Sequence, residues 1–227
     1  MGNPTAATVE PAETSENPLL RIGGNGYRGD LRATGRARHF LRDREIYSEG
    51  DDADTVFKVE SGVVRTYKFL RDGRRHINAF HGPGSVIGLE VGKVYGISAA
   101  AASDCAVISY GRRNLETLAS QNDQLQLQLF SSVLRNLARA QEHSVSLGRR
   151  SAVEKLALFL MGCGEHSAGG GDILLEMSRK DIADYLGLTI ETVSRTFSDL
   201  EDRALIELHG ARHVRLMDIT RLRDLFA

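Results

Sequence analysis

The chain has 227 residues, of which 41% are hydrophobic and 26% are charged, and its formal net charge is -1. This length allows two domains with cores of their own, and the composition excludes a fibrous or wholly disordered protein. The near-zero charge also excludes nucleic-acid binding through bulk positive charge, so any such binding must depend on local clusters.

The two cysteines, Cys105 and Cys163, are far apart and lie among apolar or small residues. They predict buried thiols in a reducing compartment and no disulfide framework. The sequence contains no run of about 18 apolar residues, and its first residues lack the basic and then apolar layout of a signal peptide. We therefore expect a cytoplasmic protein without a membrane partner.

Residues 1–29 are rich in Pro, Glu, Ala, Asn and Gly and are predicted to form a mobile arm. Within this arm, residues 24–29 fit the letters of a dinucleotide-binding loop. No buried strand precedes them and no clear crossover helix follows, so a phosphate would meet no helix N-terminus. Dinucleotide binding is therefore not expected.

Residues 30–113 are predicted to form a β-barrel domain, because short strand-like segments alternate with glycine turns. The dipeptide Asp72-Gly73 lies between two such segments and predicts a hairpin. The strand positions are Val56, Val59, Val63, Val64, Tyr67 and Phe69. Many short strands at this spacing are typical of an all-β barrel or sandwich.

Residues 114–147 predict one long helix, since they include neither Pro nor Gly. Leucines 118, 125 and 129 extend its apolar content toward the barrel. A second set of apolar residues recurs at a and d spacing: Leu127, Phe130, Leu134 and Leu137. That set favours a parallel coiled coil between two subunits, and the alternative is a helix that packs on its own domain. Gly148 then predicts a hinge.

Residues 148–227 are the last predicted domain, with 11 Lys and Arg against 13 Asp and Glu. We expect a helix at 149–161, a strand at 173–177, a hairpin at 205–216 and a closing helix at 219–226. Between the strand and the hairpin lie two short helices. A strand, a helix pair and a hairpin in this order are typical of a winged helix-turn-helix.

The helix pair of this domain has recognisable start and turn signals. Ser178 and Asp181 form a capping-box start for the first helix, whose apolar face holds Ile182, Ala183 and Leu186. Gly187 permits a left-handed turn, and Thr189 is a good N-cap for the second helix.

The second helix separates into two faces at 3.6 residues per turn. The apolar face holds Val193, Phe197 and Leu200, and the polar face holds Glu191, Ser194, Arg195 and Ser198. Such a polar face matches the donors and acceptors of base edges in the major groove. Taken alone, it could also be the solvated side of an ordinary helical hairpin.

The glycine-punctuated stretch resembles a known effector barrel. It includes Glu49-Gly50-Asp51, Asp72-Gly73-Arg74 and Gly82-Pro83-Gly84 through Gly88, and it is similar to the barrel of the cAMP-receptor and FNR superfamily of bacterial transcription regulators. The resemblance extends over residues 38–227. It implies an α+β fold with an N-terminal cyclic-nucleotide-binding-like β-barrel (jelly roll), a long dimerisation helix and a C-terminal winged helix-turn-helix.

Residues 191–195, Glu-Thr-Val-Ser-Arg, have the arrangement of the FNR and FixK branches. This resemblance implies a homodimeric activator of low-oxygen respiration or nitrogen-fixation genes that binds double-stranded DNA at a TTGAT/ATCAA palindrome and works with RNA polymerase. By position, Arg195 would donate to guanine, Glu191 would accept from an exocyclic amine and Ser194 would contact a neighbouring base. The candidates for DNA backbone or flank contacts are Arg179, Lys180, Thr192, Thr196, Ser198 and Arg212.

Cyclic-nucleotide members of the superfamily hold the ribose and phosphate with an acidic residue and an Arg-Ser pair after the turn at Gly88. Here Glu90 keeps the acid, but residues 97–101 (Ile-Ser-Ala-Ala-Ala) supply no arginine. A bound phosphate would lose its hydration without a compensating charge, so we do not expect cAMP to bind.

No other cofactor or metal is expected. A four-iron cluster generally requires four thiolates, and residues 1–36 contain no cysteine to join Cys105. Haem binding through His39, His76 or His81 has no supporting motif. The sequence also lacks a nucleophile elbow and zinc spacing, so no enzymatic activity is expected. The competing hypothesis is a ligand-responsive module (for a cyclic nucleotide, haem or another group) that acts on a protein partner.

Overall fold

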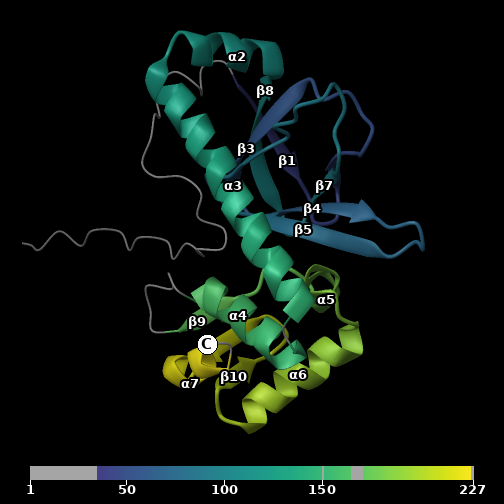
Figure 1. Ribbon diagram of the computed structural model, residues 1–227, viewed down its shortest axis with the longest axis vertical. Helices are drawn as coiled ribbons and strands as arrows, with labels where there is room; N and C mark the ends of the chain where they lie inside the picture. Colours follow the sequence, from purple (N-terminus) through teal and green to yellow (C-terminus); the bar gives the residue numbers. More distant parts are fainter. Residues whose placement is uncertain (1–34, 150, 165–170, 226–227) are drawn as a thin grey trace, which may run out of the picture.

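The computed structural model describes residues 35–149, 151–164 and 171–225. A β-barrel lies at one end of the molecule, a long helix crosses its face, and a smaller C-terminal domain lies at the other end (Figure 1). The strands are β1 (Arg36–Phe40), β2 (Glu45–Tyr47), β3 (Thr55–Ser61), β4 (Val64–Phe69), β5 (Arg75–His81), β6 (Val86–Ile87), β7 (Ser98–Ala101), β8 (Cys105–Gly111), β9 (Asp172–Leu174), β10 (Ile206–His209) and β11 (His213–Leu216). The helices are α2 (Arg112–Ser120), α3 (Asp123–Arg149), α4 (Ala152–Gly164), α5 (Arg179–Leu186), α6 (Ile190–Asp202) and α7 (Ile219–Asp224). The expected N-terminal arm and its glycine-rich loop lie outside the described residues.

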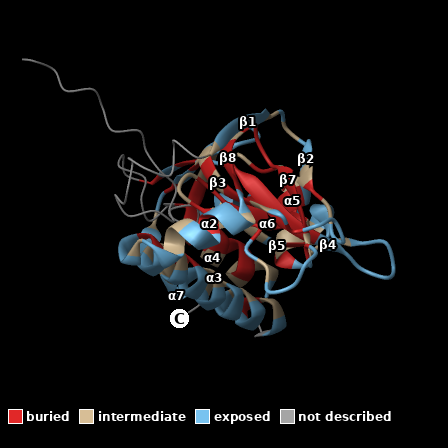
Figure 2. Ribbon diagram, turned by 90° about the horizontal axis from the view of Figure 1, so that it is seen from above, coloured by how far each residue is buried: buried red, intermediate tan, exposed pale blue. Residues whose placement is uncertain are grey.

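The barrel consists of two antiparallel four-stranded sheets with strand orders β1-β8-β3-β6 and β2-β7-β4-β5. The predicted hairpin at Asp72-Gly73 joins β4 to β5, where Gly73 has a φ of 83° and Leu70 N–H donates to the Arg74 carbonyl. Alternate side chains of the strands face inward, and the buried faces of both sheets enclose the barrel core (Figure 2). The jelly-roll barrel expected from the sequence is therefore confirmed.

The long helix after the barrel differs from the expectation of one continuous element. α2 ends at Ser120, and α3 begins at Asp123. The side chain of Asn122 accepts from Leu125 N–H at 3.0 Å, so this residue caps a new helix where a continuous one was expected. The expected hinge at Gly148 is also not a break, because α3 continues through it.

The C-terminal domain has a three-stranded sheet of order β10-β11-β9, against which α4 to α7 pack. Its first helix starts later than expected because Ser151 and Glu154 bond each other's backbone N–H groups, which caps the helix at this point. The strand β9 is shorter than the expected 173–177 segment, since the chain leaves the sheet to enter the cap of α5. The strand, helix pair and wing occur in the expected order.

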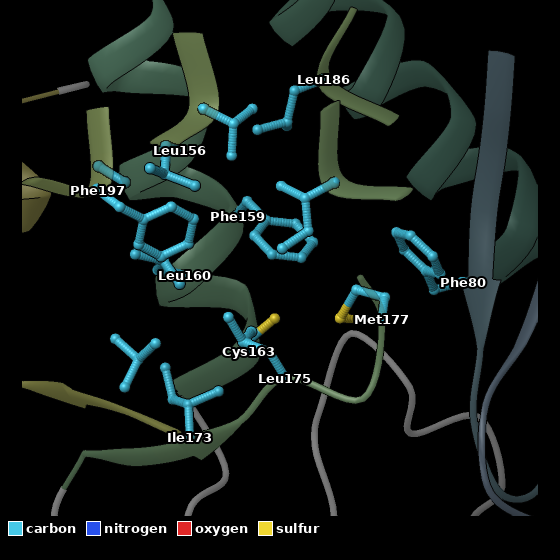
Figure 3. Packing of buried hydrophobic residues seen from close by; sticks show 14 of the residues in the cluster. Phe80, Leu156, Phe159, Leu160, Cys163, Ile173, Leu175, Met177, Leu186 and Phe197 are labelled. Carbon is cyan, nitrogen blue, oxygen red and sulfur yellow. The ribbon is translucent and has the colours of Figure 1, made fainter. Parts of the chain in front are cut away.

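The hydrophobic core of the C-terminal domain extends onto one side of the barrel, beside the barrel's own core. Phe80 of β5 faces Phe159 of α4 (Figure 3), and the two ring centroids are 6.4 Å apart. Its ring also lies 5.3 Å from that of Tyr185 in α5. Ile77 and Val63 of the barrel belong to the same buried cluster. The barrel therefore holds the C-terminal domain through apolar packing as well as through the chain connection.

Candidate nucleic-acid interface

The first helix of the pair begins with the predicted capping box. Ser178 Oγ accepts from Asp181 N–H at 3.0 Å, and Asp181 Oδ2 accepts from Ser178 N–H at 3.1 Å. Two backbone N–H groups that the helix leaves unpaired are satisfied in this way. The start of α5 is therefore fixed by its own sequence.

The turn between the helices has the conformation expected from its glycine. Gly187 has a φ of 65° and ends α5, and a Cβ at this position would lie 3.4 Å from Leu147 of α3. Thr189 then caps α6 by accepting from Thr192 N–H at 3.2 Å. A residue other than glycine would be strained by its φ, while its Cβ would only touch the side chain of Leu147.

The apolar faces of α5 and α6 pack as the sequence predicts, and Ile182, Ala183, Leu186, Val193, Phe197 and Leu200 are all buried. Arg179 takes part in this packing, because its guanidinium carbon lies 3.2 Å from the centroid of the Phe197 ring. Burial lowers the pKa of Arg179 to about 10, which leaves it charged at neutral pH. The cation thus stacks on an aromatic ring between the helices, away from the exposed face of α6.

The polar face of α6 is open to solvent. Glu191, Ser194, Arg195 and Ser198 are all exposed. Hydrogen bonds from its own N–H and from Thr189, together with the charge of Arg195, lower the pKa of Glu191, so this acceptor is ionised at neutral pH. Ser194 Oγ donates to the Ile190 carbonyl at 2.9 Å, which leaves its oxygen lone pairs available outward.

The predicted flanking residues fall into two groups. Lys180 and Arg212 are exposed, the first on α5 and the second in the turn of the wing. Thr192 is half-buried, and Thr196 is buried with its hydroxyl donating to the Thr192 carbonyl at 2.8 Å. The structure therefore leaves Lys180 and Arg212 free to reach a backbone phosphate, whereas Arg179 and Thr196 are occupied within the helix pair.

Two arginines of the barrel, which the sequence reasoning above did not single out, contact the start of the helix pair. Arg65 of β4 lies 3.3 Å from Asp181, and Arg75 of β5 lies 2.6 Å from the same carboxylate. Arg65 is buried in its strand. A charged residue within an apolar strand signals a paired ion, because an isolated buried charge is costly, but the sequence does not identify the partner.

The helix α3 carries an apolar stripe on the side away from the barrel. Leu127, Phe130, Leu134 and Leu137 have exposed fractions of 65%, 59%, 48% and 53%. The opposite side of α3 packs on the barrel through Leu125, which is buried, and Leu129, which is partly buried. The apolar residues toward the barrel are thus separate from those predicted for dimerisation, and the latter form an open surface along α3 (Figure 2).

A cavity of about 1160 Å³ lies between the barrel, α3, α4 and α5. Glu90 lines its barrel end and accepts from Gly96 N–H at 3.2 Å, and Ser98 Oγ, which does not line the cavity, accepts from Glu49 N–H at 2.9 Å. The strand β7 that would supply a phosphate-binding arginine consists of Ser98 and three buried alanines. The acid and the serine bond to the protein itself, and β7 brings no cation to a phosphate, whereas Arg139 of α3 and Lys155 of α4 do line the cavity.

Of the residues considered for other cofactors, His76 and His81 both line this cavity, whereas His39 and Cys105 lie elsewhere on the barrel. Cys105 is buried, and burial together with Asp104 and Glu176 raises the pKa of its thiol to about 11. His39 is exposed on β1, whereas His81 is buried and bonds Thr66 at 3.0 Å. Within the part of the chain that the structure describes, no group of three His, Cys, Asp or Glu side chains could hold a metal ion. The described helices are also too short or too polar to cross a membrane.

The fold and this exposed face define a regulator in which a cyclic-nucleotide-binding-like barrel carries a winged helix-turn-helix. Two protein families match the corresponding parts of the chain: the cyclic nucleotide-binding domain over residues 37–122 and the Crp-like helix-turn-helix domain over residues 154–225. The nitrogen fixation regulation protein FixK of Rhizobium meliloti is 43% identical over 182 residues, which cover 80% of this chain and 83% of that protein. The chain belongs to the CRP/FNR family of transcription regulators and is FixK-like within it.

Other relatives agree with this assignment. The transcriptional activatory protein AadR of Rhodopseudomonas palustris is 39% identical over 80% of this chain and 77% of its own length. The solved structure of FixK2 from Bradyrhizobium japonicum matches with a TM-score of 0.80 and 41% identity, covering 85% of this chain and 98% of that one. The similarity therefore includes the barrel, the long helix and the DNA-binding domain together.

Proposed function

We propose that this protein is a sequence-specific transcriptional activator that binds a TTGAT/ATCAA-type palindrome as a homodimer and needs no small-molecule effector. The observation that carries the proposal is the outward face of α6, where Glu191, Ser194 and Arg195 are exposed on a helix capped at its start and packed on α5. Such a helix can enter the major groove with its N-terminal half first.

Each residue of this face has a distinct role in the proposal. Arg195 presents a planar guanidinium that donates two hydrogen bonds to guanine O6 and N7. Glu191 is an ionised acceptor for the exocyclic amine of cytosine or adenine, and Ser194 contacts a neighbouring thymine or adjacent base. Lys180, Arg212, Thr192 and Ser198 flank the reading face and are the proposed contacts to backbone phosphates.

The proposed dimer forms along the apolar stripe of α3. Isolated surface hydrophobics are ordinary, but four of them at a and d spacing on one exposed helix face are typical of a coiled-coil seam. Two copies joined along α3 would present two reading helices related by a two-fold axis, as a palindrome requires.

Effector-free binding is supported by the barrel chemistry. The turn after Gly88 offers no arginine to a cyclic phosphate, and Glu90 is bonded to Gly96 N–H. Three relatives are named nitrogen fixation regulation proteins, which supports target genes for nitrogen fixation. We extend this to low-oxygen respiration and to action with RNA polymerase in the cytoplasm, where a bacterial chromosome lies.

The test is a binding comparison at one fixed salt concentration. Purified chain without added ligand should bind a TTGAT/ATCAA duplex at least about a thousandfold more tightly than a scrambled duplex, as is usual for specific regulators. In a second series at increasing salt concentration, the affinity for the palindrome should fall, because phosphate contacts release counterions. Equal binding of both duplexes, or an absolute need for cAMP, a cluster or haem, would contradict the proposal. Equal binding would favour a module that acts on a protein partner.

A further inference from the structure

A network of ion pairs joins the barrel to the first helix of the DNA-binding pair. Arg75 Nη2 lies 2.6 Å from Asp181 and 2.7 Å from Asp184, and Arg75 Nε donates to Asp184 at 2.8 Å. Arg65 lies 3.3 Å from Asp181 and 2.8 Å from Asp43 of the barrel. The side chain of Asp181 is only 3% exposed, so the centre of this network is out of contact with solvent.

Asp181 has two functions at once in this network. Its Oδ2 closes the capping box with Ser178, and its carboxylate also accepts from Arg65 and from Arg75. The barrel therefore contacts the N-terminus of α5 through Asp181, the residue that closes the cap of this helix. Because the turn at Gly187 is short and α6 packs on α5, an orientation imposed on α5 is passed to the reading helix.

Further contacts surround the same helix. Arg42 Nη2 donates to the Glu176 carbonyl at 2.9 Å, and Ser103 Oγ donates to the Glu176 carboxylate at 2.5 Å, just before α5. Near the end of α5, Tyr185 stacks on His143 of α3 with ring centroids 3.9 Å apart and also lies 5.3 Å from the ring of Phe80 in the barrel. The start of the helix pair is thus held by the barrel, while its middle rests on the helix that carries the dimer stripe.

We infer that Arg75, assisted by Arg65, is a positioning residue for DNA recognition: it fixes the angle of the helix pair relative to α3 and so sets the separation of the two reading helices in the dimer. This inference rests on the proposed two-fold site. A guanidinium that bonds two carboxylates in fixed directions adds an angular constraint to the apolar packing between barrel and helix pair. The side chains of the protein therefore orient the helix pair without a bound ligand.

The first test measures the tolerance of half-site spacing. If the two reading helices of the dimer are held rigidly, the dimer should bind a palindrome with two extra central base pairs much more weakly. The insertion both separates the half-sites and rotates one relative to the other. Arg75→Gln should lower the preference for the correct spacing by about fivefold or more, the usual range of coupling between two sites. Arg74→Gln is the matched control, since Arg74 is the adjacent residue, 78% exposed, and its ion pair is with Asp72 in the same hairpin.

Conservative variants distinguish a positioning effect of Arg75 on DNA recognition from a general loss of protein stability. Arg75→Lys keeps the positive charge but lacks the planar guanidinium that donates to two carboxylates. It should therefore retain more of the spacing preference than Arg75→Gln. Asp184→Asn leaves the pair between Arg75 and Asp181 in place and should give a smaller loss than Arg75→Gln. Thermal unfolding of each protein is compared in parallel. A uniform drop in affinity for both spacings, in proportion to lost stability, would overturn the inference.

A second measurement does not depend on DNA. Spin labels at Arg71→Cys in the β4–β5 hairpin and Asp202→Cys at the end of α6 report the distance between the domains, in labelled chains diluted with unlabelled protein. The distance distribution should broaden in Arg75→Gln and stay narrow in Arg74→Gln. A distribution that stays equally narrow in both would overturn the inference. If the parent chain does not prefer the palindrome over a scrambled duplex, the proposed function is wrong. The distances between the spin labels then still show whether Arg75 fixes the helix pair.

Discussion

At the scale of single residues, Arg195 has the most specific expected effect. Its guanidinium is exposed on the outer face of α6, and a bidentate contact to guanine is typically worth about 1–3 kcal/mol of discrimination. Arg195→Ala should lose that amount at one base pair in each half-site, measured as binding to a series of base-swapped duplexes. Arg203→Ala is the control, because Arg203 follows the end of α6 and pairs with Asp199. Full discrimination at the guanine by the Arg195→Ala protein would refute the assignment.

Substitution of two glycines by alanine should change the free energy of unfolding in opposite directions. Gly187→Ala places a Cβ on a residue with a φ of 65° and should lower the free energy of unfolding by about 1–2 kcal/mol. Gly148→Ala adds a better helix former inside α3, where a Cβ meets nothing within 4 Å, and should raise it by about 0.5 kcal/mol. Urea titration of both variants checks this. Destabilisation by Gly148→Ala would instead support the hinge that the sequence predicts.

At the scale of elements, the two sides of α3 have different surroundings. The barrel side is buried with the core, whereas the stripe of Leu127, Phe130, Leu134 and Leu137 is exposed. Phe130→Lys should shift the protein toward monomers by sedimentation and weaken palindrome binding, because a charge in an apolar seam is poorly tolerated. Gln121→Lys introduces the same charge at an exposed position at the end of α2, outside α3, and should leave the dimer intact. Dimers that persist in Phe130→Lys would locate the interface elsewhere.

At the scale of the whole molecule, two histidines at the junction of the barrel, α3 and the DNA-binding domain link stability to pH. Burial and the charge of Arg139 lower the pKa of His81 to about 4, and burial with His76 and Lys155 lowers that of His143 to about 4. The unfolded chain therefore binds more protons between about pH 6.5 and 4. This contribution to stability is complete above pH 6.5 and is lost as the pH falls through this window, by up to about 3 kcal/mol for the buried His81 and by less for the half-buried His143, whose charge is partly screened by solvent.

This pH dependence is measurable by urea unfolding at pH 7 and pH 5. The parent protein should lose stability between the two conditions, and His81→Gln should lose about 2 kcal/mol less, because one neutral buried imidazole has been removed. His39→Gln serves as the control, since His39 is exposed on β1. An identical loss in the parent and the His81→Gln protein would show that this imidazole is not the group being protonated.

The sequence alone determined those features that depend on short-range chemistry. Ser178 with Asp181, Gly187 and Thr189 predicted the start, turn and second cap of the helix pair, because capping and left-handed turns need particular side chains at particular positions. Period-2 and period-3.6 patterns likewise predicted the strands and the buried face of α6. The reading face followed directly, since the residues opposite a buried stripe must be exposed.

Only the tertiary structure decided the features that join distant parts of the chain. Asn122 could have continued a helix, and its role as a cap became clear only where α3 turns away from α2. Arg179 was expected beside a phosphate but stacks on Phe197, because the fold places that ring next to it. Arg75 and Asp181 are 106 residues apart, and no local pattern pairs them. Contacts at such separation depend on how two domains dock, which propensity and periodicity do not encode.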